Sequence, residues 1–105
     1  MSEERARPPI HFVAFHSPGP AWQEGTAFFE QPGVEDHAAY YEAELNAGRL
    51  ETGGPFTDSS GGMAVFGADV GRAQAEEIAL ADPAVRSGLL RVEVRPWLTA
   101  LTRPR

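Results

Sequence analysis

The chain has 105 residues, 42% of them hydrophobic, which fits one globular domain and excludes a disordered tail. It contains no cysteine and no lysine, so disulfides, thiolate chemistry and lysine Schiff bases are excluded. A formal net charge of −6 argues against nucleic-acid binding, which depends on neutralising phosphates.

The hydropathy pattern also argues against a membrane partner. No apolar run approaches the roughly 20 residues that a membrane-spanning helix needs. The first ten residues, MSEERARPPI, lack the apolar region of a secretory signal, so we expect a cytoplasmic protein. We expect a single domain over residues 1–105, with a core over about 10–97 and terminal arms at 1–9 and 98–105.

The first predicted element is a strand over residues 10–16, IHFVAFH, with apolar side chains on both faces. Such a strand is typical of a sheet that is covered on both sides. Residues 17–32 then form a long connection that contains Trp22, Phe28 and Phe29. A loop of this length is either a surface loop held by its aromatic side chains or a lid over a pocket, and both interpretations remain open.

A helix is predicted from about Val34 to Ala47, because apolar residues recur at the spacing of one helix face and Gly48 suits a helix end. That face includes His37 and Tyr41. A short strand over residues 49–52 follows, closed by the turn Gly53-Gly54-Pro55, and residues 56–62 are rich in turn formers.

The second half repeats the pattern of strand, helix and strand. Residues 63–66, MAVF, predict the third strand, and Asp69 is a candidate N-cap for a helix that runs to about Ala81. Pro83 disfavours helix at Asp82, which is then suited to cap a short turn. The fourth strand is predicted over residues 89–95, ended by Pro96-Trp97.

The element order is therefore βαββαβ, which predicts an α+β, ferredoxin-like fold. In this fold a four-stranded antiparallel sheet carries both helices on one face. The other face would expose Val13 and Phe15 of the first strand, which are unfavourable in water as part of a large patch. We therefore expect a two-fold homodimer that stacks sheet on sheet.

The strongest candidate for chemistry is His37 with Asp82. The fold packs the two helices antiparallel, which brings the end of the second helix near the start of the first. Asp82 would then orient the His37 ring, as the carboxylate does in catalytic triads. The positive helix end favours a neutral imidazole, the form that a general base requires. The alternative is structural: a packed histidine and an Asp-Pro helix cap.

Evidence for a metal site in the sequence is weak. His11 and His16 lie five positions apart on one strand, so they point to opposite faces and cannot chelate together. His16 with His37 and Asp82 would supply three ligands, but nothing in their spacing demands a metal. The glycines at 53, 54, 61 and 62 do not precede a helix as in a phosphate-binding loop. We therefore expect no metal and no cofactor.

Several segments together resemble the YCII-related (YciI-like) proteins, over about residues 10–97. They are the helix histidine in DHAAYYEAELNAGRL, the TGGPF turn, MAVF, ALADPAV and the final VEVRPW. The resemblance implies a dimeric α/β barrel of ferredoxin-like subunits with a pocket in each and a His–Asp active site, which maps onto His37 and Asp82. One member type is a dehydrochlorinase acting on a chlorinated hydroxyquinone, and the wider group includes muconolactone isomerase-like enzymes.

The resulting hypothesis is a cofactor-free enzyme that removes a proton from a small cyclic or aromatic compound, leading to elimination or isomerisation. The residues predicted to contact the substrate are His16, Trp22, Tyr41, Pro55 and Phe56. One alternative is a non-catalytic small-ligand-binding or accessory dimer that has the same pocket. Another is a structural dimer in which His37 and Asp82 only join two helix ends.

Overall fold

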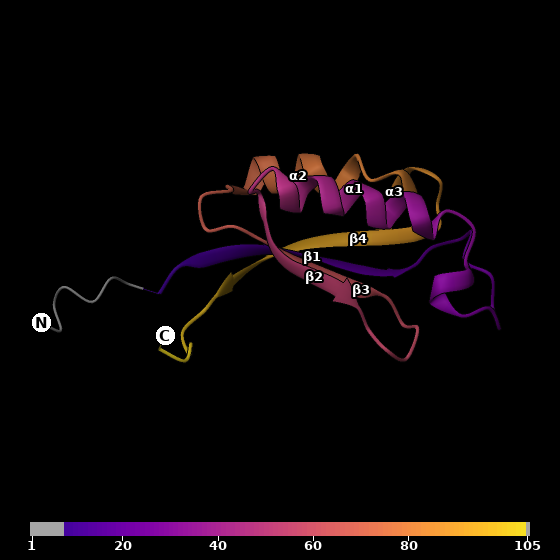
Figure 1. Cartoon of the computed structure of the whole chain (residues 1–105), viewed down its shortest axis with the longest axis horizontal. Helices are drawn as coiled ribbons and strands as arrows, with labels where there is room; N and C mark the ends of the chain where they lie inside the picture. Colours follow the sequence, from indigo (N-terminus) through magenta and orange to yellow (C-terminus); the bar gives the residue numbers. More distant parts are fainter. Residues whose placement is uncertain (1–7, 105) are drawn as a thin grey trace, which may run out of the picture.

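The computed structural model describes residues 8–104, and they form one layer of helix on one sheet (Figure 1). The strands are β1 (Ile10–Pro18), β2 (Leu50–Pro55), β3 (Gly62–Phe66) and β4 (Leu90–Leu98). They pair antiparallel in the order β2-β3-β1-β4, so β2 and β4 are the edges. The predicted ferredoxin-like order is confirmed.

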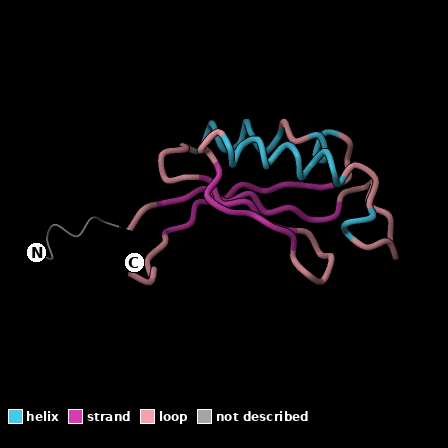
Figure 2. The backbone as a smooth tube through the Cα atoms, viewed as in Figure 1, coloured by secondary structure: helices cyan, strands magenta, loops and turns pink. Residues whose placement is uncertain are grey.

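Three helices lie on the same side of the sheet (Figure 2): α1 (Val34–Asn46), α2 (Arg72–Leu80) and the single-turn α3 (Pro83–Arg86). The 3-10 helix η2 (Phe28–Glu30) lies at the end of the sheet, in the connection before α1. The main core lies between α1, α2 and the sheet, and it includes Ala14, Phe66 and Ile78. None of the helices among residues 8–104 has the length and hydropathy that crossing a membrane would require.

Both edge strands are longer than predicted. β4 continues through Pro96 and Trp97 to Leu98, and β2 includes Gly53-Gly54-Pro55, for which the sequence predicted a turn. Proline lacks an amide hydrogen, but an edge strand has one side with no neighbour, so Pro55 and Pro96 break no ladder that the sheet requires. The same glycines that favour a turn are here paired with β3.

The second helix begins later than predicted. Its N-cap is Gly71, not Asp69, which stays exposed in the preceding turn. Val70 is 3% exposed and belongs to the core, and its amide closes a turn onto the carbonyl of Gly67. Burying Val70 therefore fixes a turn at the position where the cap was expected, and α2 starts only after it.

The long connection is attached to the domain at both ends. Gly19 and Ala21 donate backbone hydrogen bonds to Leu89 and Gly88, just before β4. At the other end the buried amide of Gln31 bonds the backbone of Gln23 and Thr26. The segment thus forms a fixed wall next to α1, built around the buried ring of Phe28.

The terminal arms are described only in part. The predicted arm at 1–9 lies outside the described residues except for Pro8 and Pro9, and Arg105 of the other arm lies outside as well. Thr99 donates both its amide and its hydroxyl hydrogen to the carbonyl of Pro9, which joins the bases of the two arms. Leu101 is 97% exposed, as expected of an arm.

Gly61 is the glycine whose replacement the fold tolerates least. Its φ of 132° is unfavourable for other residues, and an added Cβ would overlap the carbonyl oxygen of His16. We expect Gly61→Ala to lower the free energy of unfolding by about 1–3 kcal/mol, measured by urea denaturation. Gly54→Ala is the matched control, because its Cβ would meet nothing within 4 Å, and it should change stability by less than about 0.5 kcal/mol. Equal effects would contradict this prediction.

Candidate active site

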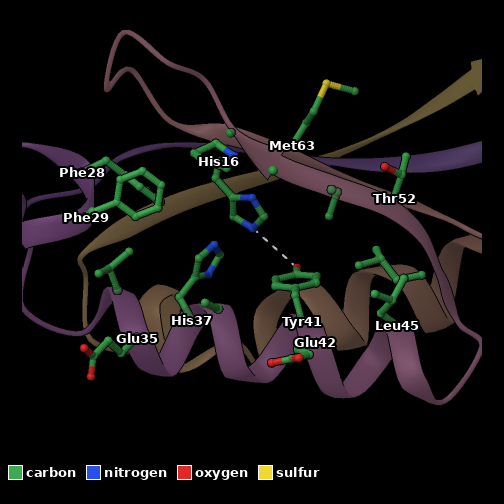
Figure 3. A pocket seen from close by; sticks show the side chains of 18 of the residues that line it. His16, Phe28, Phe29, Glu35, His37, Tyr41, Glu42, Leu45, Thr52 and Met63 are labelled. Carbon is green, nitrogen blue, oxygen red and sulfur yellow. Dashed lines mark hydrogen bonds between the residues drawn. The ribbon is translucent and has the colours of Figure 1, made fainter.

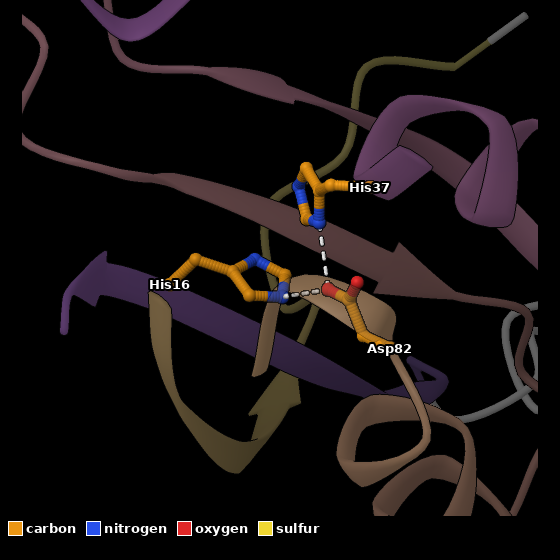
Figure 4. Close-up of side chains that lie close together, drawn as sticks. All are labelled: His16, His37 and Asp82. Atoms are coloured by element: carbon orange, nitrogen blue, oxygen red, sulfur yellow. Dashed lines mark hydrogen bonds and ion pairs between the residues drawn. The ribbon is translucent and has the colours of Figure 1, made fainter. Parts of the chain in front are cut away.

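His37 and Asp82 meet where the helix ends converge. Nδ1 of His37 donates to Oδ2 of Asp82 across 2.6 Å, so the contact expected from the sequence is present (Figure 4). His37 lies in the first turn of α1, which begins after Gly33 at a φ of 96°. Asp82 is fully buried between α2 and α3. The two residues are 45 positions apart, and only the packing of the helices joins them.

Asp82 is held in place by its second oxygen. Oδ1 accepts the amide hydrogen of Ala84 at 2.9 Å, which makes Asp82 the N-cap of α3, and Pro83 occupies the first position of that helix. The predicted capping role is therefore confirmed. Because Oδ1 is fixed by the cap, Oδ2 is left to face the two histidine rings.

His16 is the third member of this cluster. It extends from the helix-facing side of β1, is 5% exposed, and its ring centroid lies 5.0 Å from that of His37. Its Nε2 lies 3.4 Å from the hydroxyl of Tyr41 and 3.8 Å from Oδ2 of Asp82. Each of the three residues His16, His37 and Asp82 offers a ligand atom, and these atoms lie within 4.8 Å of one another.

Burial sets the protonation of His16 and Tyr41. It is the largest cause that lowers the pKa of His16 from 6.5 to about 4; the neighbouring His37 adds to this effect and Asp82 opposes it. Burial also raises the pKa of Tyr41 well above its usual value. At neutral pH the Tyr41 phenol therefore keeps its proton and the ring of His16 is neutral.

The pKa of His16 predicts how stability depends on pH. Between pH 6.5 and about 4 the unfolded chain protonates His16 and the folded chain does not, so stability falls as the pH is lowered. The loss is on the order of 3 kcal/mol at most. Urea denaturation between pH 7 and 4 should show a steeper loss for the wild type than for His16→Gln. Parallel curves for the two proteins would contradict the prediction.

A cavity of about 610 Å³ opens beside this cluster, between α1 and strands β2 and β3. Figure 3 shows His37, Tyr41 and Leu45 pointing from α1 toward the strands, with His16 pointing back at them. Phe28 and Phe29 form one end of the cavity. The volume suits a small organic ligand. The floor is open because β2 and β3 contribute small residues there: Gly53, Gly54, Gly62 and Ala64.

The residues predicted to bind substrate divide into two groups. His16, Tyr41 and Pro55 line the cavity, and His37 lies at the same wall. Trp22 and Phe56 are not among the lining residues; Trp22 packs behind Phe28, with ring centroids 5.9 Å apart. The role of Gly53 and Gly54 as floor was not predicted, because a Gly-Gly-Pro sequence is typical of a turn.

Turn and surface residues account for the other polar candidates. Ser60 donates its amide and its hydroxyl hydrogen to Asp58, which identifies this segment as a turn. His11 bonds the carbonyl of Phe66 through Nδ1, away from the cavity. Glu35 and Glu42 line the mouth of the cavity, but their side chains point away from it (Figure 3).

The comparison with known families covers most of the chain. The sequence profile of the YCII-related domain matches residues 14–98. The chain belongs to the YCII-related domain family. It is also similar to the uncharacterized protein YjpA of Bacillus subtilis (strain 168), with 36% identity over 72 residues, which cover 69% of this chain and 84% of that protein. In this chain the candidate site consists of His16, His37 and Asp82.

Proposed function

We propose that this YCII-related protein is an enzyme that moves a proton on a small cyclic or aromatic compound, without a cofactor. The observation that carries the proposal is the 2.6 Å hydrogen bond from Nδ1 of His37 to Asp82, at the wall of a 610 Å³ cavity. With Nδ1 occupied as a donor, the lone pair of the neutral ring lies on Nε2. A general base requires this arrangement.

The proposed reaction begins with proton abstraction. Nε2 of His37 takes a proton from a carbon that a neighbouring carbonyl acidifies, and the C–H electron pair enters the ring system of the substrate. The imidazolium that forms is stabilised by the carboxylate of Asp82. In an elimination, a new C=C bond forms and the leaving group departs with its bonding pair. In an isomerisation, His37 returns the proton to another atom.

The lining residues favour an uncharged, ring-shaped substrate. Phe28, Phe29 and Tyr41 offer aromatic surface, and the small residues of β2 and β3 leave room for a flat molecule. No arginine lines this cavity among the described residues, and the chain has no lysine. A carboxylate or phosphate group would therefore find no cation with which to pair.

The second candidate is non-catalytic binding of the same class of ligand. It is favoured by the cap on α3: Asp82 has a structural role that requires no chemistry. Here His37 would be a hydrogen-bonding anchor for the ligand. The two candidates share the cavity and differ only in whether a proton is transferred.

Deuterium exchange separates the candidates whichever compound is the natural substrate. Neutral cyclic ketones, phenols and quinones are first screened by thermal shift, and compounds that bind are incubated with metal-free protein in D₂O. NMR should show deuterium at the acidified carbon with wild-type protein and much less with His37→Ala. Binding without exchange or conversion would favour the second candidate, and absence of binding across the set would count against both.

We also propose that the chain forms a homodimer through the uncovered face of the sheet. The side chains of Val13 and Phe15 alternate with helix-facing residues of β1, so they lie on the face that no helix covers. The expectation that both are exposed there is wrong for Val13, which is only 1% exposed within the single chain, while Phe15 is half-buried. The guanidinium of Arg95 lies over the Phe15 ring, 5.7 Å from its centroid, and is the only cation found over that ring among the described residues.

Light scattering tests this arrangement. At micromolar concentration we expect twice the mass of the chain, and Phe15→Glu should shift the protein toward monomer by placing a charge in the stacked sheets. Thr57→Glu, in the exposed loop between β2 and β3, is the control and should leave the dimer intact. A wild-type monomer would remove the dimer from the proposal.

A further inference from the structure

We propose that His16, His37 and Asp82 form a binding site for one divalent transition-metal ion of the zinc class. Their ligand atoms lie within 4.8 Å of one another, and they come from β1, from α1 and from the junction of α2 with α3 (Figure 4). The metal site uses the side chains of the proposed proton transfer in a different protonation state, but the proposal does not depend on that reaction.

The donor set selects the class of metal. Two imidazole nitrogens and one carboxylate oxygen are a typical zinc set, whereas calcium and magnesium require mainly oxygen ligands. Three protein ligands are the number found where zinc keeps one position open. Here the open position would face the cavity, because His16 and His37 both line it.

The contacts of His16 suit a cation when its ring carries the proton on Nδ1. In that tautomer Nε2 accepts from the Tyr41 hydroxyl at 3.4 Å and presents a lone pair to Oδ2 of Asp82 at 3.8 Å. A metal ion bound to both atoms would replace this contact between two acceptors.

The distances require the two imidazoles to move closer together. In a tetrahedral zinc site, donor atoms lie about 3.3 Å apart, given metal–ligand bonds near 2.0–2.1 Å. Oδ2 is 2.6 Å from His37 Nδ1 and 3.8 Å from His16 Nε2, and the three ligand atoms lie within 4.8 Å of one another. The two separations from Oδ2 therefore change by less than about 1 Å, and the two imidazole nitrogens approach by up to about 1.5 Å. Oδ1 is already held by the amide of Ala84, which is the kind of outer contact that orients metal ligands.

Metal binding and proton transfer are mutually exclusive in this geometry. To coordinate through Nδ1, neutral His37 must move its Nδ1 proton to Nε2. The atom proposed to act as the base would then carry a hydrogen. Zinc is therefore expected to suppress deuterium exchange as it occupies the site.

Calorimetric titration of Zn²⁺ into the untagged, full-length, metal-free chain tests the site. We expect saturation at one equivalent in the micromolar range, and we expect Co²⁺ to give the intense visible bands of a four-coordinate nitrogen and oxygen site. The matched variants are His16→Gln and His11→Gln, which each remove one imidazole from β1. His16→Gln should weaken Zn²⁺ binding by at least about 10–100-fold, the range known for loss of an outer contact alone. His11→Gln should leave binding unchanged.

Each outcome decides the proposal. No binding at millimolar Zn²⁺, or equal weakening by the two variants, would overturn it. The Co²⁺ spectrum of the wild type keeps the test valid if His16→Gln folds poorly, and circular dichroism shows whether it does. Zinc binding with no deuterium exchange would leave the metal site standing and remove the proposed reaction. Exchange without zinc binding would do the reverse.

Discussion

Replacing His37 by alanine is expected to lower the rate of deuterium exchange or turnover by about 10²–10⁴-fold, the usual contribution of a general base. The reason is that Nε2 of His37 is the atom proposed to take the proton, and Nδ1 is bound to Asp82. The measurement is the exchange rate in D₂O with any compound that the thermal-shift screen identifies. Binding of that compound should weaken much less than the rate falls.

A rescue experiment separates a lost base from a damaged fold. His37→Ala leaves a space at the wall of the cavity, and free imidazole added to the variant should restore part of the rate if the missing group is the base. His11→Gln is the control for loss of a histidine away from the cavity, and its rate should equal that of the wild type. Full activity in His37→Ala would end the catalytic interpretation.

The pairing of His37 with Asp82 was predictable because each residue carries a local signal. Helical periodicity placed His37 on the inward face of α1, and the Asp-Pro pair marked the end of α2. The order of the elements then required the two helix ends to converge. The structure confirms their contact at 2.6 Å.

Other features depend on tertiary packing that no local pattern records. Pro55 and Pro96 resemble strand breakers, yet both remain paired because β2 and β4 are edges of the sheet. Asp69 resembles a helix cap, but burial of Val70 moves the helix start to Arg72. These outcomes are decided by position in the sheet and by the core.

The approach of His16 to the His37–Asp82 pair is the clearest case. His16 lies on a strand and Asp82 follows a helix 66 positions later, so sequence spacing carries no information about their 3.8 Å separation. The alternation of side chains along the predicted strand indicated the face of the sheet on which His16 lies. Only the packing of the helices against the sheet brings its Nε2 within 3.4 Å of the Tyr41 hydroxyl and 3.8 Å of the carboxylate.

Asp82→Ala is expected to be the most destabilising single substitution in the cluster. The carboxylate caps α3 through Oδ1, and loss of a cap costs about 0.5–2 kcal/mol. The carboxylate also accepts a hydrogen bond from His37 inside the protein. Removing one partner of a buried ion pair costs about 3–5 kcal/mol where both groups are strongly desolvated. Since His37 keeps some contact with the cavity, we expect a total loss of about 2–5 kcal/mol of unfolding free energy.

Two companion variants assign this loss to its causes. Asp82→Asn keeps the capping oxygen and the volume, so its cost should be about half, and the difference measures the cap. Asp69→Ala removes an exposed carboxylate that caps no helix, and it should change stability by less than about 0.5 kcal/mol. Urea denaturation measures the stability of all three variants, and their m-values should equal that of the wild type. A loss in Asp82→Ala no larger than in Asp69→Ala would mean that the carboxylate neither caps α3 nor holds the histidine, and both roles assigned to it would fall together.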